Sequence, residues 1–250
     1  MPQPLEPLVS LAATHDLLVI EDTAHALGAT YRGRAAGALG DAAVFSFYAS
    51  KNITTGEGGM ITTDRTEVIG QLRRERLHGI DVDVSQRVEY RQWESVSIGW
   101  KFNLTDLSAA IGLVQLERLS GFLERRRALD QRYRAHLSGM SALRVQQGPA
   151  GAETAAHLFP VMLEPGALRI GRDEMLRALL AENIGVGVHF RALPLHRFFR
   201  DVVGARPESV PVACEVSSRL LSLPLWPGMS DADQDDVVEA LTRIVTFHRA

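Results

Sequence analysis

The chain has 250 residues, of which 46% are hydrophobic and 23% are charged, and this composition is typical of a folded globular protein. The formal net charge of −3 and the pI near 6.2 argue against nucleic acid as a partner. The single cysteine, Cys214, excludes an internal disulfide. Because no apolar run is long enough to cross a bilayer and residues 1–8 lack signal-peptide features, we expect a cytoplasmic protein that does not bind membranes.

The first hundred residues predict alternating helices and strands, which is typical of an α/β layer. Apolar residues recur at helical or strand-like spacing between polar turns. Residues 80–100 are polar and show little periodicity, so we expect an irregular loop there. The helices are expected at residues 4–16 and 65–76, and the strands at residues 17–20, 42–47 and 60–63.

The second half begins with the longest helical pattern, over residues 105–137, for which Thr105 and Asp106 are candidate N-terminal caps. Residues 148–153 resemble a linker. We expect residues 1–115 to form one domain and residues 116–250 to form a linking helix and a smaller α+β domain. Later strands are expected at residues 157–163 and 185–190, and later helices at residues 173–182, 212–221 and 231–248.

Asp22 lies just past the first predicted strand. An acid at the carboxyl end of a buried strand lies where α/β proteins bind ligands. The alternative is that Asp22 caps a following helix, which aspartate often does. A third use, as the ribose-binding acid of a dinucleotide fold, lacks the G-x-G-x-x-G motif that would precede it.

Lys51 follows the second predicted strand and precedes a glycine-rich segment, residues 56–59. A lysine becomes a nucleophile when burial or nearby positive charge lowers its pKa. Ser46, Thr54, Thr55 and the backbone N–H groups of residues 56–59 can bind a phosphate, although the segment can equally be a tight turn between strands. It is not a P-loop, because no Gly-Lys-Ser or Gly-Lys-Thr ends it.

Asp22 and Lys51 together fit the requirements of pyridoxal phosphate chemistry. A lysine bonds to the aldehyde of this cofactor, and a carboxylate keeps its ring nitrogen protonated. His25, three residues beyond Asp22, can pack on the ring or brace the carboxylate, or it can be structural. The eight histidines show no ligand spacing such as H-E-x-x-H, so we expect no catalytic metal.

Residues 21–28 (EDTAHALG), 45–52 (FSFYASKN) and 56–59 (GEGG) resemble the sugar-nucleotide aminotransferases of the DegT/StrS family. The resemblance continues through residues 78–79, 99–106, 187–191 and 223–227, and so covers nearly the whole chain. Residues 189–192 and 103–106 are most similar to the UDP-aminoarabinose aminotransferases of lipid A modification. The resemblance implies aminotransferase fold type I, with a mostly parallel sheet in a partial large domain and a smaller C-terminal α+β domain.

The resemblance also implies roles for single residues. Lys51 would bond to pyridoxal 5'-phosphate and move a proton during the reaction, and Asp22 would pair with the ring nitrogen. The remaining implied contacts are His25 beside the ring, Ser46 on the cofactor phosphate, Asn103 on the phosphate held by the neighbouring subunit of a homodimer, and His189 on the sugar nucleotide. Lys51 places the chain with the transaminases rather than with the dehydratases of the family, which have a histidine at that position.

The chain departs from the family pattern at its beginning. Family members carry a further segment before residues 4–16, including a Ser-Gly-Thr loop for the phosphate, whose absence would remove N–H donors at a helix N-terminus.

The first hypothesis for the function is an enzyme that moves an amino group from glutamate to a keto sugar nucleotide for cell-surface polysaccharide or lipopolysaccharide. The second is a truncated, non-catalytic homologue. A nicotinamide-dependent sugar enzyme would explain Asp22 but not Lys51.

Overall fold

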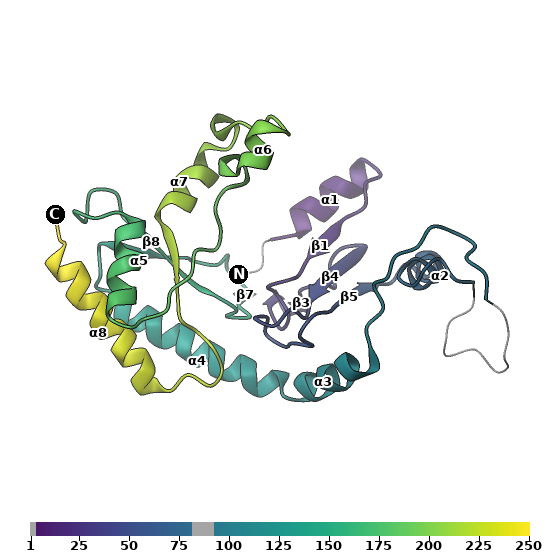
Figure 1. Cartoon of the computed structure of the whole chain (residues 1–250), viewed down its shortest axis with the longest axis horizontal. Coiled ribbons are helices and arrows are strands. Elements are labelled where there is room, and N and C mark those ends of the chain that lie inside the picture. Colours follow the sequence, from purple (N-terminus) through teal and green to yellow (C-terminus); the bar gives the residue numbers. More distant parts are fainter. Residues whose placement is uncertain (1–3, 82–92) are drawn as a thin grey trace. The chain divides into compact units, whose positions relative to one another are not determined.

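The computed structural model describes residues 4–81 and 93–250 (Figure 1). It divides into two compact units. Unit 1 comprises Met1–Gly121 and Gly148–Ala155, and unit 2 comprises Phe122–Gln147 and Ala156–Ala250. Each unit has its own sheets and helices, and the helices and strands alternate along the chain as expected for an α/β protein.

Unit 1 contains a mixed sheet of three strands in the order β1-β4-β5. Strand β1 (Ile20–Asp22) pairs in parallel with β4 (Ala42–Ser46), and β4 pairs antiparallel with β5 (Gly59–Thr63). Only one of the two described pairings is thus parallel. A second, antiparallel sheet has the order β3-β2-β7. Its strands are β2 (Thr30–Tyr31), β3 (Arg34–Ala35) and β7 (Ala152–Glu153).

The prediction of a buried strand at residues 17–20 is wrong, because the described strand begins at Ile20 and the sheet face that carries Ile20 is exposed. Ile20, Val44 and Ile61 have exposed fractions of 68%, 44% and 50%. The register puts Val44 beside Asp22 and Ile61 beside Val44, so these side chains share one sheet face. The expectation failed because an apolar run does not show whether both faces of a strand are covered.

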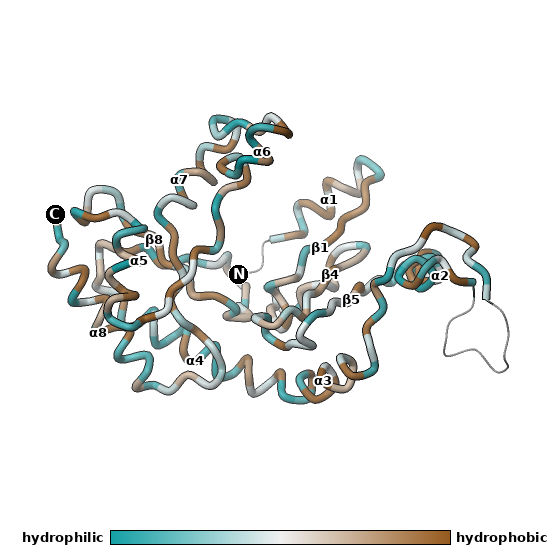
Figure 2. The backbone as a smooth tube through the Cα atoms, viewed as in Figure 1, coloured by the Kyte–Doolittle hydropathy of each residue, from teal (hydrophilic) through white to brown (hydrophobic). Residues whose placement is uncertain are grey.

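Helix α1 (Glu6–Thr14) and helix α2 (Thr66–Glu75) confirm two predicted helices of unit 1. Helix α2 buries none of its residues and is largely hydrophilic in Figure 2. Its charged composition therefore reflects contact with solvent on most of its surface.

Residues 93–102 are largely irregular, as predicted for residues 80–100, and return along residues 75–81 through hydrogen bonds and isolated bridges. Residues 82–92 of the predicted loop lie outside the described residues. The Phe102 N–H donates to the Arg76 carbonyl at 2.8 Å, and the Val96 N–H donates to the Gly79 carbonyl at 2.9 Å. Gly79 has φ +66°, and a Cβ there would lie 1.9 Å from the Ser97 carbonyl oxygen. Glycine is therefore required at this crossing.

The helix predicted over residues 105–137 is two helices, α3 (Asp106–Glu117) and α4 (Leu119–Leu137). Thr105 caps α3 as predicted, and its Oγ1 accepts a hydrogen bond from the Ser108 N–H at 3.2 Å. The helices separate at Arg118, close to Gly121, where unit 1 gives way to unit 2 along the chain. Helical periodicity alone does not report such a break, because both sides of it are helical.

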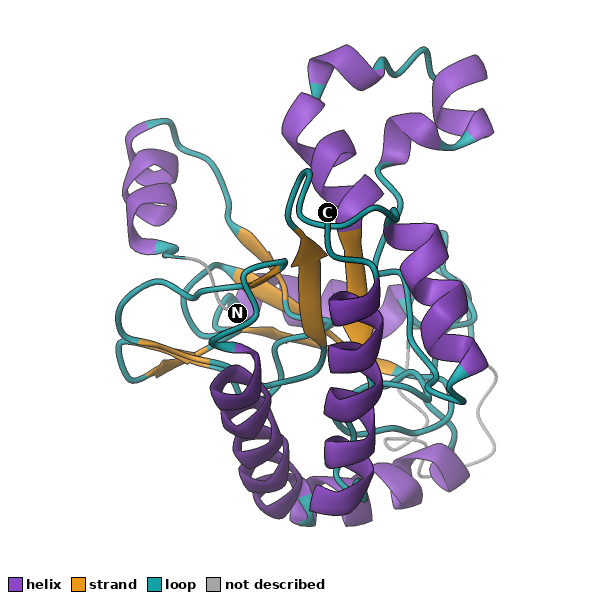
Figure 3. Ribbon diagram, turned by 90° about the vertical axis from the view of Figure 1, so that its left-hand side faces the viewer, coloured by secondary structure: helices purple, strands orange, loops and turns teal. Residues whose placement is uncertain are grey.

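Unit 2 is an antiparallel sheet packed with helices, and Figure 3 shows its strands between helices. The sheet order is β6-β8-β9, and one cluster of buried apolar side chains from the sheet and from the helices forms the core. In the described part of the chain, no helix combines the length and the apolar character needed to cross a membrane. The strands are β6 (Leu143–Val145), β8 (Phe159–Leu163) and β9 (Leu220–Leu223), and the helices besides α4 are α5 (Arg172–Ala181), α6 (Arg197–Asp201), α7 (Pro211–Arg219) and α8 (Asp231–Phe247), with short 3₁₀ turns η2 (Leu193–Leu195) and η3 (Pro207–Ser209).

Two predictions for unit 2 are wrong in detail. The strand expected at residues 185–190 is a single bridge, in which Gly187 and Ser222 exchange backbone hydrogen bonds of 3.1 and 2.8 Å. The helix expected at residues 212–221 ends at Arg219, and β9 follows it directly. A short apolar run such as Leu220–Leu223 fits a helix end and a buried strand equally well.

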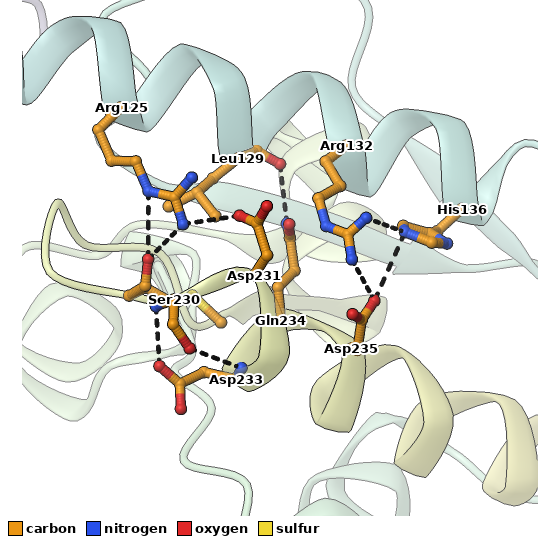
Figure 4. A network of polar contacts seen from close by, with 10 residues as sticks. Arg125, Leu129, Arg132, His136, Ser230, Asp231, Asp233, Gln234 and Asp235 are labelled. Carbon is orange, nitrogen blue, oxygen red and sulfur yellow. Dashed lines mark hydrogen bonds and ion pairs between the residues drawn. The ribbon is translucent and has the colours of Figure 1, made fainter.

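Polar side chains connect α4 to the N-terminal part of α8 (Figure 4). Arg125 lies 2.8 Å from the Asp231 carboxylate, and Arg132 pairs with Asp235. The buried amide of Gln234 donates to the Leu129 carbonyl at 2.8 Å. These contacts fix the register of the two helices, to which exposed ion pairs alone would contribute little.

Arg126 is the buried cation of unit 2, and burial lowers its pKa to about 10. Its Nη1 donates to the carbonyls of Ala156, His157 and Leu225 at 3.2, 3.3 and 3.2 Å. One guanidinium thus joins two segments that are far apart in sequence to α4.

We expect Arg126→Ala to lower the free energy of unfolding by about 2–4 kcal/mol, because three carbonyl groups lose a charged donor. Urea denaturation measures this loss. Arg177→Ala, at an exposed position of α5, is the matched control and should change stability by less than about 0.5 kcal/mol. Equal stability of the two variants would contradict the role given to Arg126.

Candidate functional site

The candidate site in unit 1 is built at the carboxyl ends of β1 and β4. Asp22 is the last residue of β1 and pairs with Val44, and Ser46 is the last residue of β4. Since side chains alternate along a strand, Asp22, Val44 and Ser46 project from the same face. The structure therefore brings two of the predicted cofactor-binding residues to one end of one sheet face.

Asp22 begins a turn rather than a helix. Its Oδ1 accepts a hydrogen bond from the Ala24 N–H at 3.0 Å, and residues 24–28 form successive turns. The helix-cap interpretation is therefore wrong, although Asp22 does bind a backbone donor two residues later, as aspartate often does in turns. His25 is exposed within this turn.

Glu21 is a buried carboxylate that the sequence analysis did not single out. Only 6% of its surface is exposed, and it accepts hydrogen bonds from the N–H groups of Gly37, Leu39 and Gly40 at 2.9, 2.7 and 2.7 Å. Glu21 thereby connects β1 to the turn that precedes β4, next to Asp22. The sequence offered two separate signals, an acidic residue at position 21 and two glycines in a later loop. Only the fold shows that the Glu21 carboxylate pairs with that loop.

The turn that binds Glu21 requires its glycines. Gly37 has φ +90°, and a Cβ there would lie 2.5 Å from the Phe45 ring. A Cβ on Gly40 would lie 2.6 Å from the Val19 carbonyl oxygen. The backbone can approach the Glu21 carboxylate this closely because both positions lack a side chain.

We expect Glu21→Ala to lower the free energy of unfolding by about 2–4 kcal/mol, because three N–H groups lose a charged acceptor. Glu21→Gln should lose less, since its amide oxygen can still accept hydrogen bonds. Urea denaturation of both variants, with the exposed Glu57→Ala as control, measures the loss of free energy of unfolding. If Glu21→Ala and Glu57→Ala were equally stable, the connection would be unimportant.

Lys51 is half-buried at the end of a turn in which its N–H donates to the Tyr48 carbonyl at 2.9 Å. Burial lowers the pKa of Lys51 below the ordinary 10.5, and the Asp22 carboxylate acts in the opposite direction and raises it. Asp22 is therefore close enough to act electrostatically on this amine. The lowered pKa increases the fraction of unprotonated, nucleophilic amine at a given pH.

We expect Asp22→Asn to lower the pKa of Lys51 further, because a neutral amide no longer stabilises the ammonium form. Lys51 and Lys101 are the two lysines of the chain. After reductive methylation with ¹³C-formaldehyde, an NMR pH titration can follow both, and Lys101→Arg assigns them. Asp64→Asn, at an exposed position, is the control. A higher or unchanged Lys51 pKa in Asp22→Asn would contradict the proximity of the two groups.

Ser46 retains the ability to bind an anion, whereas Thr54 and Thr55 use their hydroxyls within the glycine-rich turn. Ser46 Oγ accepts from the Tyr48 N–H at 3.3 Å, and its own proton can point elsewhere. The Thr54 hydroxyl donates to the Phe47 carbonyl at 3.2 Å, and the Thr55 hydroxyl donates to the Glu57 carbonyl at 2.8 Å. For the two threonines, the tight-turn interpretation is therefore right.

Asn103 also belongs to unit 1, and its Oδ1 accepts a hydrogen bond from Lys101 Nζ. Because the amide oxygen faces Lys101, the Asn103 NH₂ group points away from it. Among the described residues, no group of three or more His, Cys, Asp or Glu side chains could hold a metal ion.

His189 lies in unit 2, whereas Asp22, His25, Ser46, Lys51 and Asn103 lie in unit 1. Its Nδ1 is 3.0 Å from Ser222 Oγ, and its ring meets the Phe190 ring edge-on at 5.0 Å. Gly187 makes room for the imidazole, since a Cβ there would lie 2.4 Å from His189 Cε1. The orientation of His189 is thus set within unit 2.

The sequence profile of the DegT/DnrJ/EryC1/StrS aminotransferase family matches residues 1–242. The protein MJ1066 of Methanocaldococcus jannaschii is 39% identical over 251 residues, which cover 99% of this chain and 65% of that protein. The spore coat polysaccharide biosynthesis protein SpsC of Bacillus subtilis is 39% identical over 245 residues, which cover 96% of this chain and 63% of SpsC. The chain therefore spans less than two thirds of the length of these curated relatives.

Among solved structures, the candidate sugar aminotransferase Spr1654 from Streptococcus pneumoniae in its PMP form superposes with a TM-score of 0.85 at 30% identity. The match covers 92% of this chain and 59% of that chain. The same protein in its PLP form gives a TM-score of 0.83. The fold described above is therefore similar to that of a candidate sugar aminotransferase that has been solved in its PLP and PMP forms.

Proposed function

Because the chain belongs to the DegT/DnrJ/EryC1/StrS aminotransferase family, we propose that it transfers an amino group from glutamate to a keto sugar nucleotide with pyridoxal 5'-phosphate as cofactor. The observation that carries this proposal is the half-buried Lys51, whose pKa is lowered by burial and raised by Asp22. A nucleophilic amine opposite a carboxylate is what this cofactor requires of a protein.

The residues present fit the cofactor. Asp22 would bind the ring nitrogen, Ser46 would donate to the phosphate and His25 would lie beside the ring, all from the carboxyl ends of β1 and β4 and the turn after β1. Asn103 would reach the phosphate held by a second copy of the chain. When bound, pyridoxal phosphate supplies an electron sink for carbanion formation.

The protein's own contribution is to hold charges and move a proton. The Asp22 carboxylate would keep a proton on the ring nitrogen, because an anion beside a cation stabilises the charged form. Lys51, in its unprotonated form, would accept a proton at Nζ and return it, as a general base and then a general acid. Its lowered pKa suits this role, because it increases the fraction of unprotonated amine at a given pH.

The substrate class rests on the relatives. SpsC is named for spore coat polysaccharide biosynthesis, which supports a sugar substrate for a cell-surface polysaccharide. His189, oriented by Ser222, is the proposed contact to the sugar nucleotide. Lipopolysaccharide as the destination and the UDP-aminoarabinose subtype are proposed from the resemblance of residues 103–106 and 189–192. The homodimer is proposed from the role that the resemblance implies for Asn103, and the cytoplasmic location from the lack of an apolar run long enough to cross a bilayer.

We expect borohydride treatment of the protein with pyridoxal phosphate to fix a pyridoxyl label on Lys51. Mass spectrometry of proteolytic peptides locates the label. Lys101→Arg should keep the label, and Lys51→Arg should lose it. A label on Lys101 alone, or no label at saturating cofactor, would refute the proposed function.

A second candidate is a truncated homologue that lacks the N-terminal part of the cofactor site and does not catalyse by itself. The exposed apolar face formed by Ile20, Val44 and Ile61 favours it, because a contiguous exposed apolar patch marks a surface that binds a further segment or partner. An absorption titration with pyridoxal phosphate separates the two candidates, since the truncated homologue should develop no absorption band of a lysine imine. An in-frame continuation in the DNA upstream of Met1 would favour the enzyme.

A further inference from the structure

The residue after Lys51 is a buried amide. Only 6% of Asn52 is exposed, although asparagine is usually a surface residue. Its Nδ2 donates to the Leu27 carbonyl at 3.2 Å and to the Ala155 carbonyl at 3.0 Å. Both contacts lie within unit 1, and each joins the Lys51 segment to a part of the chain that is distant in sequence.

The two acceptors belong to the turn after Asp22 and to the segment after β7. Leu27 lies in the turn that begins directly after Asp22, and Ala155 closely follows β7. Strand β7 pairs with β2, and β2 begins soon after the same turn. The Asn52 side chain therefore bonds the turn that carries Lys51, residues 48–52 (the lysine loop), to two segments. One is the turn after Asp22, and the other is the segment after β7, which is itself paired with β2.

The sheet alone does not fix Lys51. The ladder places Asp22 and Ser46, but β4 ends at Ser46 and Lys51 follows in a turn beyond the strand. The turn is held locally, since the Lys51 N–H donates to the Tyr48 carbonyl and the Thr55 N–H donates to the Phe47 carbonyl. These bonds shape the turn but do not set its distance from the Asp22 turn.

We propose that Asn52 is a positioning residue, which holds the Lys51 amine opposite the Asp22 carboxylate by bonding the lysine loop to the turn after Asp22. This inference rests on the proposed function, because the distance matters only if one ligand is held between the two groups. The Coulomb interaction and the covalent geometry both depend on that distance, and a misplacement of about 1 Å can cost a hundredfold in rate.

The test uses Asn52→Ala and Asn52→Asp, the second of which keeps the size of the side chain but turns its donor into an acceptor. Gln234→Ala and Gln234→Glu are matched controls, since Gln234 is another buried amide that donates to a main-chain carbonyl, but in unit 2. Urea denaturation of all four variants shows which losses follow from reduced stability alone.

Two cofactor forms separate positioning from simple binding. Pyridoxal phosphate can bond to Lys51, whereas pyridoxamine phosphate lacks the aldehyde and binds only through its other contacts. We expect the Asn52 variants to lose about tenfold or more in affinity for pyridoxal phosphate and clearly less for pyridoxamine phosphate. The Gln234 variants should change neither affinity. Equal losses for both cofactor forms, or none, would overturn the inference.

The proposed function can fail independently of this inference. If the unsubstituted protein binds no pyridoxal phosphate, the function is wrong, and the ¹³C-methyl titration of Lys51 still tests the positioning. Asn52→Ala should then raise the pKa of Lys51 towards its ordinary value, because a loosened loop exposes the amine to water. A Lys51 pKa that does not differ between Asn52→Ala and Gln234→Ala would overturn the inference in that case too.

Discussion

The parallel pairing of β1 with β4 is the constraint on which the candidate site depends. Its register places Asp22 beside Val44, so the carboxylate and the Ser46 hydroxyl leave the sheet on one face at one end. Three residue pairs form this ladder, and no strand pairs with the other edge of β1 among the described residues. So short a pairing needs further contacts to hold its register.

Polar connections supply those contacts in unit 1, whereas apolar packing dominates unit 2. The Thr23 hydroxyl extends the ladder by donating to the Val44 carbonyl at 2.6 Å, and the Glu21 carboxylate and the Asn52 amide join strands to turns. In unit 2, one apolar cluster from β6, β8, β9 and the helices α4, α5 and α8 forms the core. Hydrogen bonds depend on direction as well as distance, so they define the geometry of a site more narrowly than apolar contacts do.

Local patterns were enough to predict many elements and to select the candidate site residues. Thr105 caps α3 as the sequence indicated, and α2, α5 and α8 begin and end within a few residues of their predicted bounds. Asp22 and Lys51 stood out because each follows a strand-like run and each has a side chain that a cofactor can use. Caps and periodicity act between residues close in sequence, and they can therefore be found without the fold.

The tertiary structure decided the features that depend on distant neighbours. The exposed face of β1, the break at Arg118 and the strand β9 each follow from what packs beside a segment, which its own residues do not specify. The same is true of the two buried polar side chains in unit 1. Glu21 reaches a turn 16 to 19 residues away and Asn52 a carbonyl 103 residues away, and a polar residue is stable inside a protein only where the fold supplies its partners.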